Sequence, residues 1–279
     1  MDKTERPSPS ASLQAALTPL YGAAEARAIA RLVFEERYGL SQADILLGRV
    51  PSDWDPTIPA RLQAGEPVQY VLGSTTFCGH RIRTDRRALI PRPETEGLVE
   101  IFLREAPDHG RVLDVCTGSG CIALACKHGA PCISVEAWDI SPQALSLARD
   151  NFRLHGLEAT FREVDLTRVP DTLLSPPISF ILSNPPYVLE AERDGLHPNV
   201  LNHEPHLALF VPDDDPLRFY RPLARLARRG LLPGGGIAVE CNTAFTAQVA
   251  RLFQSAGLCR VEEIPDCYSR PRFVLARQP

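Results

Sequence analysis

The chain has 279 residues, enough for one large domain and a second small one. Hydrophobic residues make up 44% and charged residues 23%, the proportions of a soluble globular protein. The net charge of −4 and the pI of about 6.0 disfavour a protein that holds nucleic acid mainly through phosphates. No apolar run is long enough to span a membrane, and residues 1–8 lack a signal-peptide pattern. We therefore expect a cytoplasmic protein with no membrane association and no direct binding of nucleic acid.

The eight cysteines form no C-x-x-C pair, and no histidine lies at zinc-finger spacing from them. Because cytoplasmic thiols are normally reduced, we interpret most of these cysteines as small buried apolar residues. The sequence thus predicts no metal site.

The N-terminal part of the chain, residues 1–65, is predicted to be a small all-helical domain. Apolar residues recur at helical spacing from Leu13 to Leu20 and again from Ala26 to Phe34. Ser41 and Asp44 have the chemistry of a helix start, and residues 59–64 predict another short helix. We expect this domain to bind a partner or the substrate.

Residues 66–90 are predicted to be a β-hairpin linker. The segments 67–77 and 80–85 have the composition of strands, and Cys78-Gly79 between them suits a tight turn. Phe77 is either a lid over a site or a core residue of this hairpin.

Residues 91–279 are predicted to form an α/β domain with a mostly parallel, doubly wound sheet, because strand and helix patterns alternate along them. Thr95 or Glu94 could open its first helix, which carries Leu98 to Phe102. The predicted strands are 111–115, 133–138, 160–164, 178–183, 236–240, 260–264 and 272–276, and the helices that follow are 120–127, 142–154, 219–229 and 243–256.

A glycine-containing turn follows the first strand of this domain, in the run Cys116-Thr117-Gly118-Ser119-Gly120. Such a turn lets a ligand approach the backbone in front of a helix N-terminus. The next strand ends at Asp139, nineteen positions after Gly120, where a carboxylate can accept hydrogen bonds from ribose hydroxyls. Each feature alone has a structural reading, a β–α turn and a helix N-cap, but together they favour a nucleoside cofactor. A nicotinamide cofactor remains compatible with the glycine spacing.

The most informative residues are Asn184-Pro185-Pro186-Tyr187, which follow a strand of buried character. Two prolines remove backbone donors and stiffen the loop, so an amide, bare carbonyls and an aromatic ring are held in place. These groups suit gripping a planar –NH2 group against an electrophile. An enzyme that transfers a methyl group to an amino group needs that group to be held in this way, whereas an enzyme that transfers hydride does not.

These motifs together resemble class I (Rossmann-like) methyltransferases that use S-adenosyl-L-methionine. The flanking runs 65–73, 89–96 and 203–209 are similar to the HemK/PrmC family, which methylates the glutamine of the GGQ motif in peptide chain release factors. The resemblance extends from about residue 12 to the C-terminus. It implies an enzyme that transfers methyl to the amide nitrogen (N5) of that glutamine in class I release factors, in support of translation termination.

The resemblance also implies roles for individual residues. Asn184, Pro185 and Tyr187 would be catalytic, and the tetrad including Pro186 would hold the substrate amide. Asp165 would accept from the adenine amine, although an exposed turn residue is an equal reading of it. Arg92, Glu94 and Thr95 would line the cofactor mouth or merely start a helix. The cofactor-binding residues would be Cys116, Thr117, Gly118, Ser119, Gly120, Asp139, Asp165, Leu166 and Asn184.

The chain departs from the family pattern at Cys116 and Pro216, where glycine is usual, and at Cys241-Asn242 after Glu240. The first departure, with the run 77–80, also resembles a sibling branch that methylates a ribosomal-protein glutamine. His203-Glu204-Pro205 shapes either the substrate groove or a structural turn. Two other functions stay open: an N6-adenine methyltransferase on DNA or RNA, and a non-catalytic partner-binding scaffold.

Overall fold

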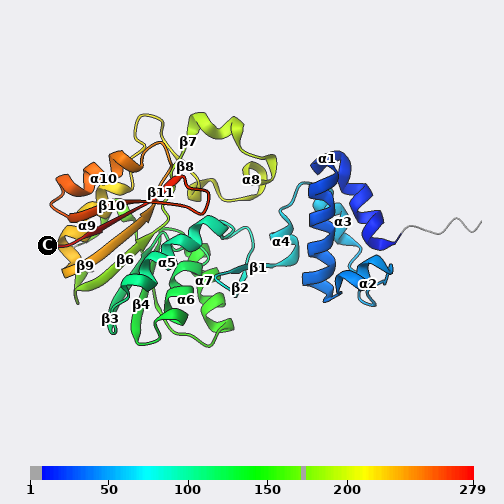
Figure 1. Ribbon diagram of the computed structural model, residues 1–279, viewed down its shortest axis with the longest axis horizontal. Coiled ribbons are helices and arrows are strands. Elements are labelled where there is room, and N and C mark those ends of the chain that lie inside the picture. Colours follow the sequence, from blue (N-terminus) through cyan, green and yellow to red (C-terminus); the bar gives the residue numbers. More distant parts are fainter. Residues whose placement is uncertain (1–7, 171–173) are drawn as a thin grey trace, which may run out of the picture. The chain divides into compact units, whose positions relative to one another are not determined.

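The structure is a computed structural model that describes residues 8–170 and 174–279 (Figure 1). The chain divides into two compact units: one holds the residues up to Ser74 with residues 197–203, and the other holds residues 75–196 and 204–279. Within the described residues, no helix combines the length and apolar character needed to cross a membrane.

The first unit is helical, and it extends past the predicted residues 1–65 to Ser74 and takes in residues 197–203. Ser41 and Asp44 form a capping box, in which the Ser41 hydroxyl accepts the Asp44 N–H and the Asp44 carboxylate accepts the Ser41 N–H. The side chains of Leu17, Phe34 and Ile58 pack in its core. Its helices are α1 (Pro9–Leu32), a π-helical turn (Val33–Arg37), α2 (Gln42–Leu46), α3 (Thr57–Gln63), α4 (Val68–Leu72) and α8 (Pro198–His203).

The predicted strand 67–77 is wrong in its first half, which forms helix α4. The Pro67 carbonyl accepts the N–H groups of Tyr70 and Val71, and Gly73 ends the turn in the left-handed region at φ 72°. Burial of Tyr70 and Val71 on one side of this turn outweighs their β propensity.

The hairpin itself is confirmed. Strands β1 (Ser74–Phe77) and β2 (His80–Arg83) are paired, and the turn residues Cys78 and Gly79 both have positive φ, at 47° and 75°. Positive φ at both central residues is what a two-residue hairpin loop of type I′ requires. Phe77 is fully buried in the core of the second unit, so the core reading of this residue holds.

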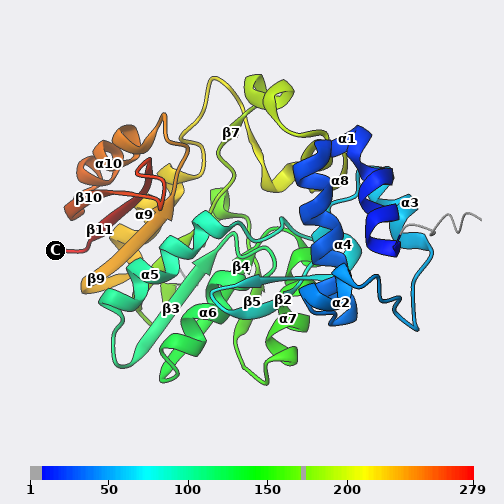
Figure 2. The same cartoon turned by 45° about the vertical axis from the view of Figure 1, so that its right-hand side comes forward.

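The predicted sheet is confirmed as a doubly wound sheet. In the described part of the chain, seven strands lie in the order β10-β11-β9-β6-β3-β4-β5. The pairs among β9, β6, β3, β4 and β5 are parallel, while β11 pairs antiparallel with both β9 and β10. The strands are β3 (Gly110–Val115), β4 (Ile133–Asp139), β5 (Thr160–Glu163), β6 (Ile178–Ser183), β9 (Leu231–Glu240), β10 (Cys259–Pro265) and β11 (Pro271–Arg277). Figure 2 shows β3 beside the helices α5 (Glu96–Glu105) and α6 (Cys121–Gly129).

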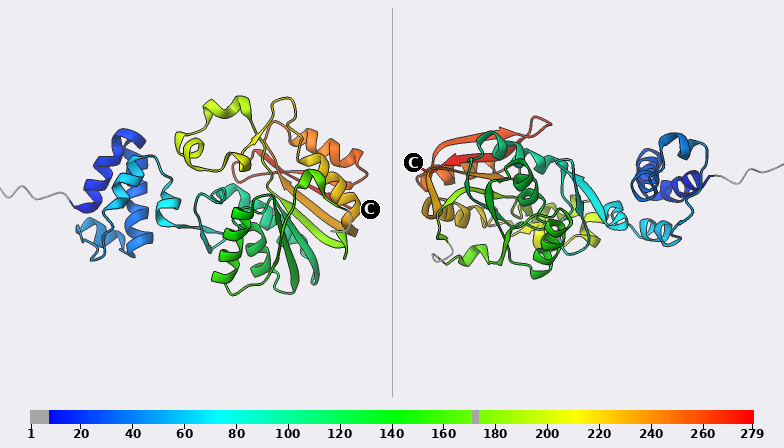
Figure 3. Two further views of the ribbon diagram at one scale, coloured as in Figure 1. Left: turned by 180° about the vertical axis from the view of Figure 1, so that it is seen from behind. Right: turned by 90° about the horizontal axis from the view of Figure 1, so that it is seen from below.

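Helices cover both faces of this sheet (Figure 3). The helices α5 (Glu96–Glu105), α6 (Cys121–Gly129) and α7 (Pro142–Leu154) share one apolar core with it. On the other face, α9 (Tyr220–Gly230) and α10 (Thr246–Ser255) share a second core. Parallel strands buried on both faces explain the near-continuous apolar runs in their sequences.

Short elements between residues 188 and 211 were not predicted. Strand β7 (Val188–Leu189) pairs in parallel with β8 (Phe210–Val211), and the Val188 N–H donates to the Leu209 carbonyl. Turns of 3-10 helix occupy Glu190–Gly195 and His206–Ala208. Two-residue strands carry too little pattern to be found from sequence, yet this pair holds the 205–209 segment beside the Asn184–Tyr187 loop.

The prediction that most cysteines are buried is only partly correct. All eight belong to the described residues and all are free thiols, but Cys132 and Cys267 are exposed and Cys78, Cys116 and Cys259 are half-buried. The buried ones lie on α6 and at the end of β9.

Asn151 on α7 joins three segments of the second unit. Its side-chain oxygen accepts the Arg83 N–H at 2.7 Å, and its amide group donates to the carbonyls of Arg83 and Ser119 at 3.2 and 2.9 Å. The side chain is fully buried. One amide therefore pins the hairpin and the glycine turn to α7.

We expect Asn151→Ala to lower the free energy of unfolding by about 2–4 kcal/mol, because it leaves buried backbone groups unpaired and opens a cavity. Urea titration followed by circular dichroism measures this change. Arg153→Ala on the same helix is the matched control, since Arg153 is exposed, and it should change stability little. Equal losses in the two variants would contradict the role given to Asn151.

Candidate functional site

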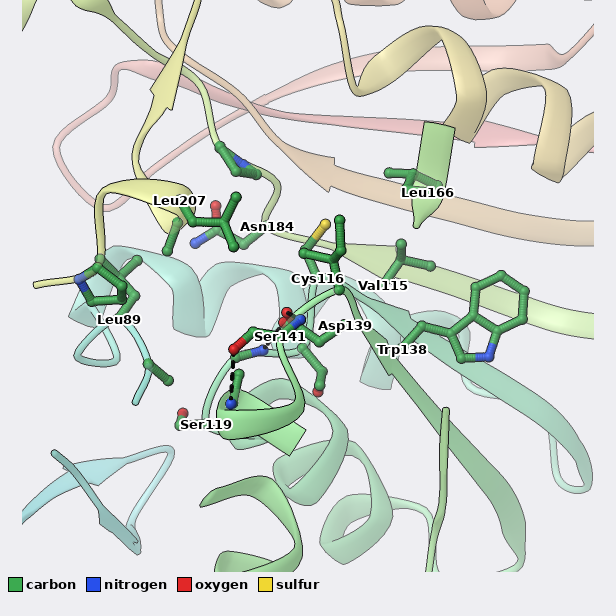
Figure 4. A pocket seen from close by; sticks show the side chains of 18 of the residues that line it. Leu89, Val115, Cys116, Ser119, Trp138, Asp139, Ser141, Leu166, Asn184 and Leu207 are labelled. Carbon is green, nitrogen blue, oxygen red and sulfur yellow. Dashed lines mark hydrogen bonds between the residues drawn. The ribbon is translucent and has the colours of Figure 1, made fainter. Parts of the chain in front are cut away.

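A pocket opens at the carboxyl ends of the central parallel strands, entirely within the second unit (Figure 4). Its walls come from residues 115–119 after β3, 138–141 after β4, 164–167 after β5, and Asn184 and Pro186 after β6. The rest of the lining comes from residues 87–92 and from Thr95, Cys121, Ile122, Ala144, Pro205, Leu207, Ala208, Arg218 and Phe219. This is where ligands bind in doubly wound sheets, because the loops after neighbouring strands meet there.

The two glycines of the turn after β3 serve different purposes. Gly118 has a φ of 55°, and a Cβ built on it would meet only the Ala88 methyl at 3.9 Å, so its backbone is accessible from the pocket. Gly120 has a φ of 79°, and a Cβ there would lie 3.0 Å from the Cβ of Ala148 on α7. Gly120 does not line the pocket; it allows α6 and α7 to pack closely.

Cys116 adopts a left-handed backbone conformation with a φ of 61°. This region favours glycine, so the residue is held there by the surrounding turn. The side chain lines the pocket, and burial raises the pKa of its thiol, with Asp139 and Asp114 adding to the shift. The thiol is therefore neutral at physiological pH and a poor nucleophile.

Asp139 holds the glycine turn while facing the pocket. One carboxylate oxygen accepts the Gly118 N–H and the other the Ser141 N–H, each at 2.9 Å. Burial raises the pKa of Asp139, opposed by these backbone hydrogen bonds. Each oxygen has a second lone pair, so the group can still accept from a ligand. The N-cap of α7 is Ser141, whose hydroxyl accepts the Ala144 N–H.

Asp114, beneath the turn, received no role from the sequence. Its Oδ2 accepts the Thr117 hydroxyl at 2.6 Å and the Ala123 N–H at 3.2 Å. Burial raises the pKa of Asp114 to about 7, and its Oδ1 has no hydrogen-bond partner among the described residues. The residue supports the turn from below and does not line the pocket.

Asp165 and Leu166 both line the pocket at the end of β5. Asp165 also caps a 3-10 turn, because its Oδ1 accepts the hydroxyl and N–H of Thr167. These hydrogen bonds lower its pKa, so it is ionised at neutral pH. Leu166 is buried and presents an apolar surface beside it.

Asn184 is the first residue of a hydrogen-bond chain that ends in a buried carboxylate. Its Nδ2 donates to the Thr95 hydroxyl at 3.1 Å, and that hydroxyl donates to Oε2 of Glu240 at 2.7 Å. Oε1 of Glu240 accepts the Tyr187 hydroxyl at 2.8 Å. Burial raises the pKa of Glu240, and the hydrogen bonds from Thr95 and Tyr187 oppose this shift. These hydrogen bonds determine the orientation of the Asn184 amide: the nitrogen faces Thr95, and Oδ1 remains available as an acceptor.

Only two of the four residues Asn184-Pro185-Pro186-Tyr187 face the pocket. Asn184 and Pro186 line the pocket, whereas Pro185 and Tyr187 do not. Tyr187 packs against the core shared with α9 and α10, and burial raises the pKa of its phenol. Its hydroxyl donates to Glu240, and this hydrogen bond helps to hold the loop.

The structure gathers most of the predicted site residues around one pocket. Gly120, Pro185 and Tyr187 lie outside its lining, and so does Glu94, while Arg92 and Thr95 lie within it. The residues brought together are Cys116, Thr117, Gly118, Ser119, Asp139, Asp165, Leu166, Asn184 and Pro186.

Glu204 anchors the pocket rim. It is buried, accepts the Ile90 N–H at 3.0 Å, and pairs with the Arg92 guanidinium at 2.6 Å. Pro205 lines the pocket, while His203 ends α8 in the helical unit. Glu204 and Pro205 therefore act as a structural turn that shapes the rim.

Sequence reasoning missed several contributors. Glu240 received no role, although a glutamate directly after the apolar run Ile237-Ala238-Val239 is a signal that could have found it. The lining residues Leu207, Arg218 and Phe219 come from segments without a strong pattern.

The fold and pocket define a class I methyltransferase, and comparisons with known proteins agree. Residues 93–203 match the family described as the methyltransferase small domain. A methyltransferase from Pyrococcus furiosus shares the fold at 16% identity and a TM-score of 0.52, over 71% of this chain and 88% of that one. A Thermus thermophilus 16S rRNA methyltransferase, solved with AdoMet and guanosine, has a TM-score of 0.50 and 14% identity over 74% of this chain and 50% of its own.

The curated relatives identify the family. The release factor glutamine methyltransferase of Bacteroides thetaiotaomicron is 39% identical over 96% of this chain and 98% of its own length. That of Deinococcus radiodurans is 40% identical over 89% and 90%. The chain belongs to the family of release factor glutamine methyltransferases.

We expect Cys116→Gly to be well tolerated and Cys116→Val to lower the free energy of unfolding by about 1–2 kcal/mol. Glycine adopts a φ of 61° without strain, whereas a β-branched side chain clashes with its own backbone there. Chemical denaturation of both variants against the parent measures the order of stability. A valine variant as stable as the glycine variant would show that the turn does not impose this conformation.

Proposed function

We propose that this protein transfers a methyl group from S-adenosyl-L-methionine to the side-chain amide nitrogen of the glutamine in the GGQ motif of class I peptide chain release factors. Family membership supports the reaction, and the pocket supplies groups suited to both reactants. We place the reaction in the cytoplasm, where translation factors act.

The pocket residues fit the proposed cofactor. Gly118 leaves room for a ligand against the backbone, Asp139 can accept from ribose hydroxyls, and Leu166 offers an apolar face for adenine. Asp165 is ionised and can accept from the adenine amine. When bound, the cofactor supplies an electrophilic methyl group on a positively charged sulfur.

The orientation of Asn184 is the observation that carries the proposal. Because its nitrogen donates to Thr95, its Oδ1 is free to accept one N–H of a substrate amide. The resemblance to the family assigns the other N–H to the backbone carbonyl of Pro185, a residue that itself lies outside the pocket lining. A planar –NH2 held at both hydrogens has its nitrogen directed at one point, and such positioning is a large part of the rate gain in group transfer.

The loop needs little reorganisation during this step. Pro185 and Pro186 restrict its backbone, and Glu240 holds it through Thr95 on one side and Tyr187 on the other. The amide nitrogen requires no strong base beforehand, since it becomes acidic once it carries the methyl group, and the proton then leaves to water.

The helical unit is proposed to dock the release factor. Leu46 at the end of α2, Leu47 directly after it and Val50 are largely exposed, although large apolar side chains are usually covered. An apolar surface of this kind suits a protein partner better than a phosphate backbone, in agreement with the net charge of −4.

The decisive assay uses labelled cofactor with a class I release factor and with the same factor carrying alanine in place of the GGQ glutamine. Label should enter the first protein and not the second. Label entering duplex DNA or ribosomal RNA instead would favour the adenine methyltransferase alternative.

Asn184→Ala should lower the rate of methyl transfer at saturating substrates by about 10²- to 10³-fold, because the amide loses one of its two acceptors. Cofactor affinity, measured by calorimetry, should change little. A variant that loses cofactor binding yet transfers methyl normally at saturation would refute the assigned role.

Thr95→Val should lower kcat by about tenfold or more, since the Asn184 amide loses the partner that orients it. Thr95→Ser is the matched control, because it keeps the hydroxyl and should restore most of the rate. The KM for the cofactor should stay near the parental value in both variants. If valine and serine behave alike, the hydroxyl does not orient Asn184.

A further inference from the structure

Three histidine side chains gather on the surface of the second unit, away from the pocket. His80 lies at the start of β2, His128 in the last turn of α6, and His155 directly after α7. One ring nitrogen from each lies within 4.8 Å of the other two. None of the three lines the pocket, so the proposed methyl transfer leaves the cluster unexplained.

The spacing of two nitrogens already matches a metal site. Nε2 of His128 lies 3.2 Å from Nδ1 of His155. In a tetrahedral zinc site with Zn–N bonds of about 2.0–2.1 Å, neighbouring ligand nitrogens are separated by roughly 3.4 Å. The two side chains therefore define one edge of such a tetrahedron.

The other nitrogen of His155 supports this reading. Nε2 lies 2.7 Å from the Arg81 carbonyl, an acceptor, and so carries the proton that it donates. This assigns the tautomer and directs the lone pair of Nδ1 toward His128. Donation from the second ring nitrogen to a backbone carbonyl is the usual arrangement of a metal-bound histidine.

The surroundings also favour a bound cation. The C-terminal ends of α6 and α7 both lie at the cluster, and helix C-termini carry partial negative charge.

His80 completes the set. Its ring stacks on that of His128, with centroids 4.0 Å apart and planes inclined by 10°. Closing three nitrogens around one ion requires a rotation of the His80 side chain out of this stack. A purely structural alternative is a chain in which His128 donates to His155 and His155 donates to Arg81.

We propose that His80, His128 and His155 form a zinc-binding site with the fourth position open to water. The ion would clamp β2 to the ends of α6 and α7, the two helices that begin at the pocket. The sequence predicted no metal site because the three histidines are far apart along the chain and follow no local spacing rule.

The test uses the full chain without a histidine tag, stripped with EDTA and titrated with zinc chloride in a calorimeter. We expect about one zinc ion per chain and a rise of several degrees in Tm. His128→Ala and His155→Ala should each weaken zinc binding by at least about tenfold and lose the Tm rise. His109→Ala, at an exposed histidine outside the cluster, is the matched control and should behave like the parent.

Circular dichroism confirms that each variant is folded, and His80→Gln provides a further variant at the hairpin should either alanine variant fail to fold. Absence of zinc binding to the parent would overturn the proposal and leave the hydrogen-bond chain as the explanation. Equal zinc binding by the parent and all three cluster variants would also overturn it, because the ion would then bind elsewhere. The outcome is independent of methyl transfer, so failure here and failure of the proposed function are distinguishable.

Discussion

The site depends on the hydrogen bonds that the buried carboxylate of Glu240 accepts. Glu240 ends β9, accepts the hydroxyls of Thr95 and Tyr187, and through Thr95 sets the direction of the Asn184 amide. A buried carboxylate that lost these donors would carry the full cost of desolvation, so the three segments hold one another in a single arrangement. The stiffness of the proline loop therefore results from its prolines and from a polar core beneath it.

The parallel sheet supplies the second constraint. Strands β3, β4, β5 and β6 run in the same direction, so the loops that follow them meet at one edge. Close packing of α6 on α7, allowed by Gly120, and the Asn151 amide keep these loops in register with the hairpin. Backbone topology thus brings the residues proposed to bind the cofactor and those proposed to bind the substrate amide to one edge of the sheet.

Sequence patterns failed where local propensity and tertiary burial disagree. Residues 68–72 include β-branched and aromatic side chains but form helix α4. Pro67 precedes the first residue of this helix and Gly73 ends it, and burial of Tyr70 and Val71 favours the helical conformation. Tyr187 was expected to pack against the substrate amide or its backbone, and the structure adds that its hydroxyl donates to Glu240. Its partner lies more than fifty positions away along the chain, and no local motif encodes such a pairing.

The sequence by itself determined the doubly wound α/β class, the helical N-terminal part, the hairpin turn at Cys78-Gly79, and the residues at the strand ends, because periodicity, turn chemistry and glycine positions are local properties. Only the tertiary structure decided which of these residues face the pocket, the orientation of Asn184, and the meeting of His80, His128 and His155. Those features arise from contacts between segments distant in sequence, and such contacts are set by packing of the whole chain.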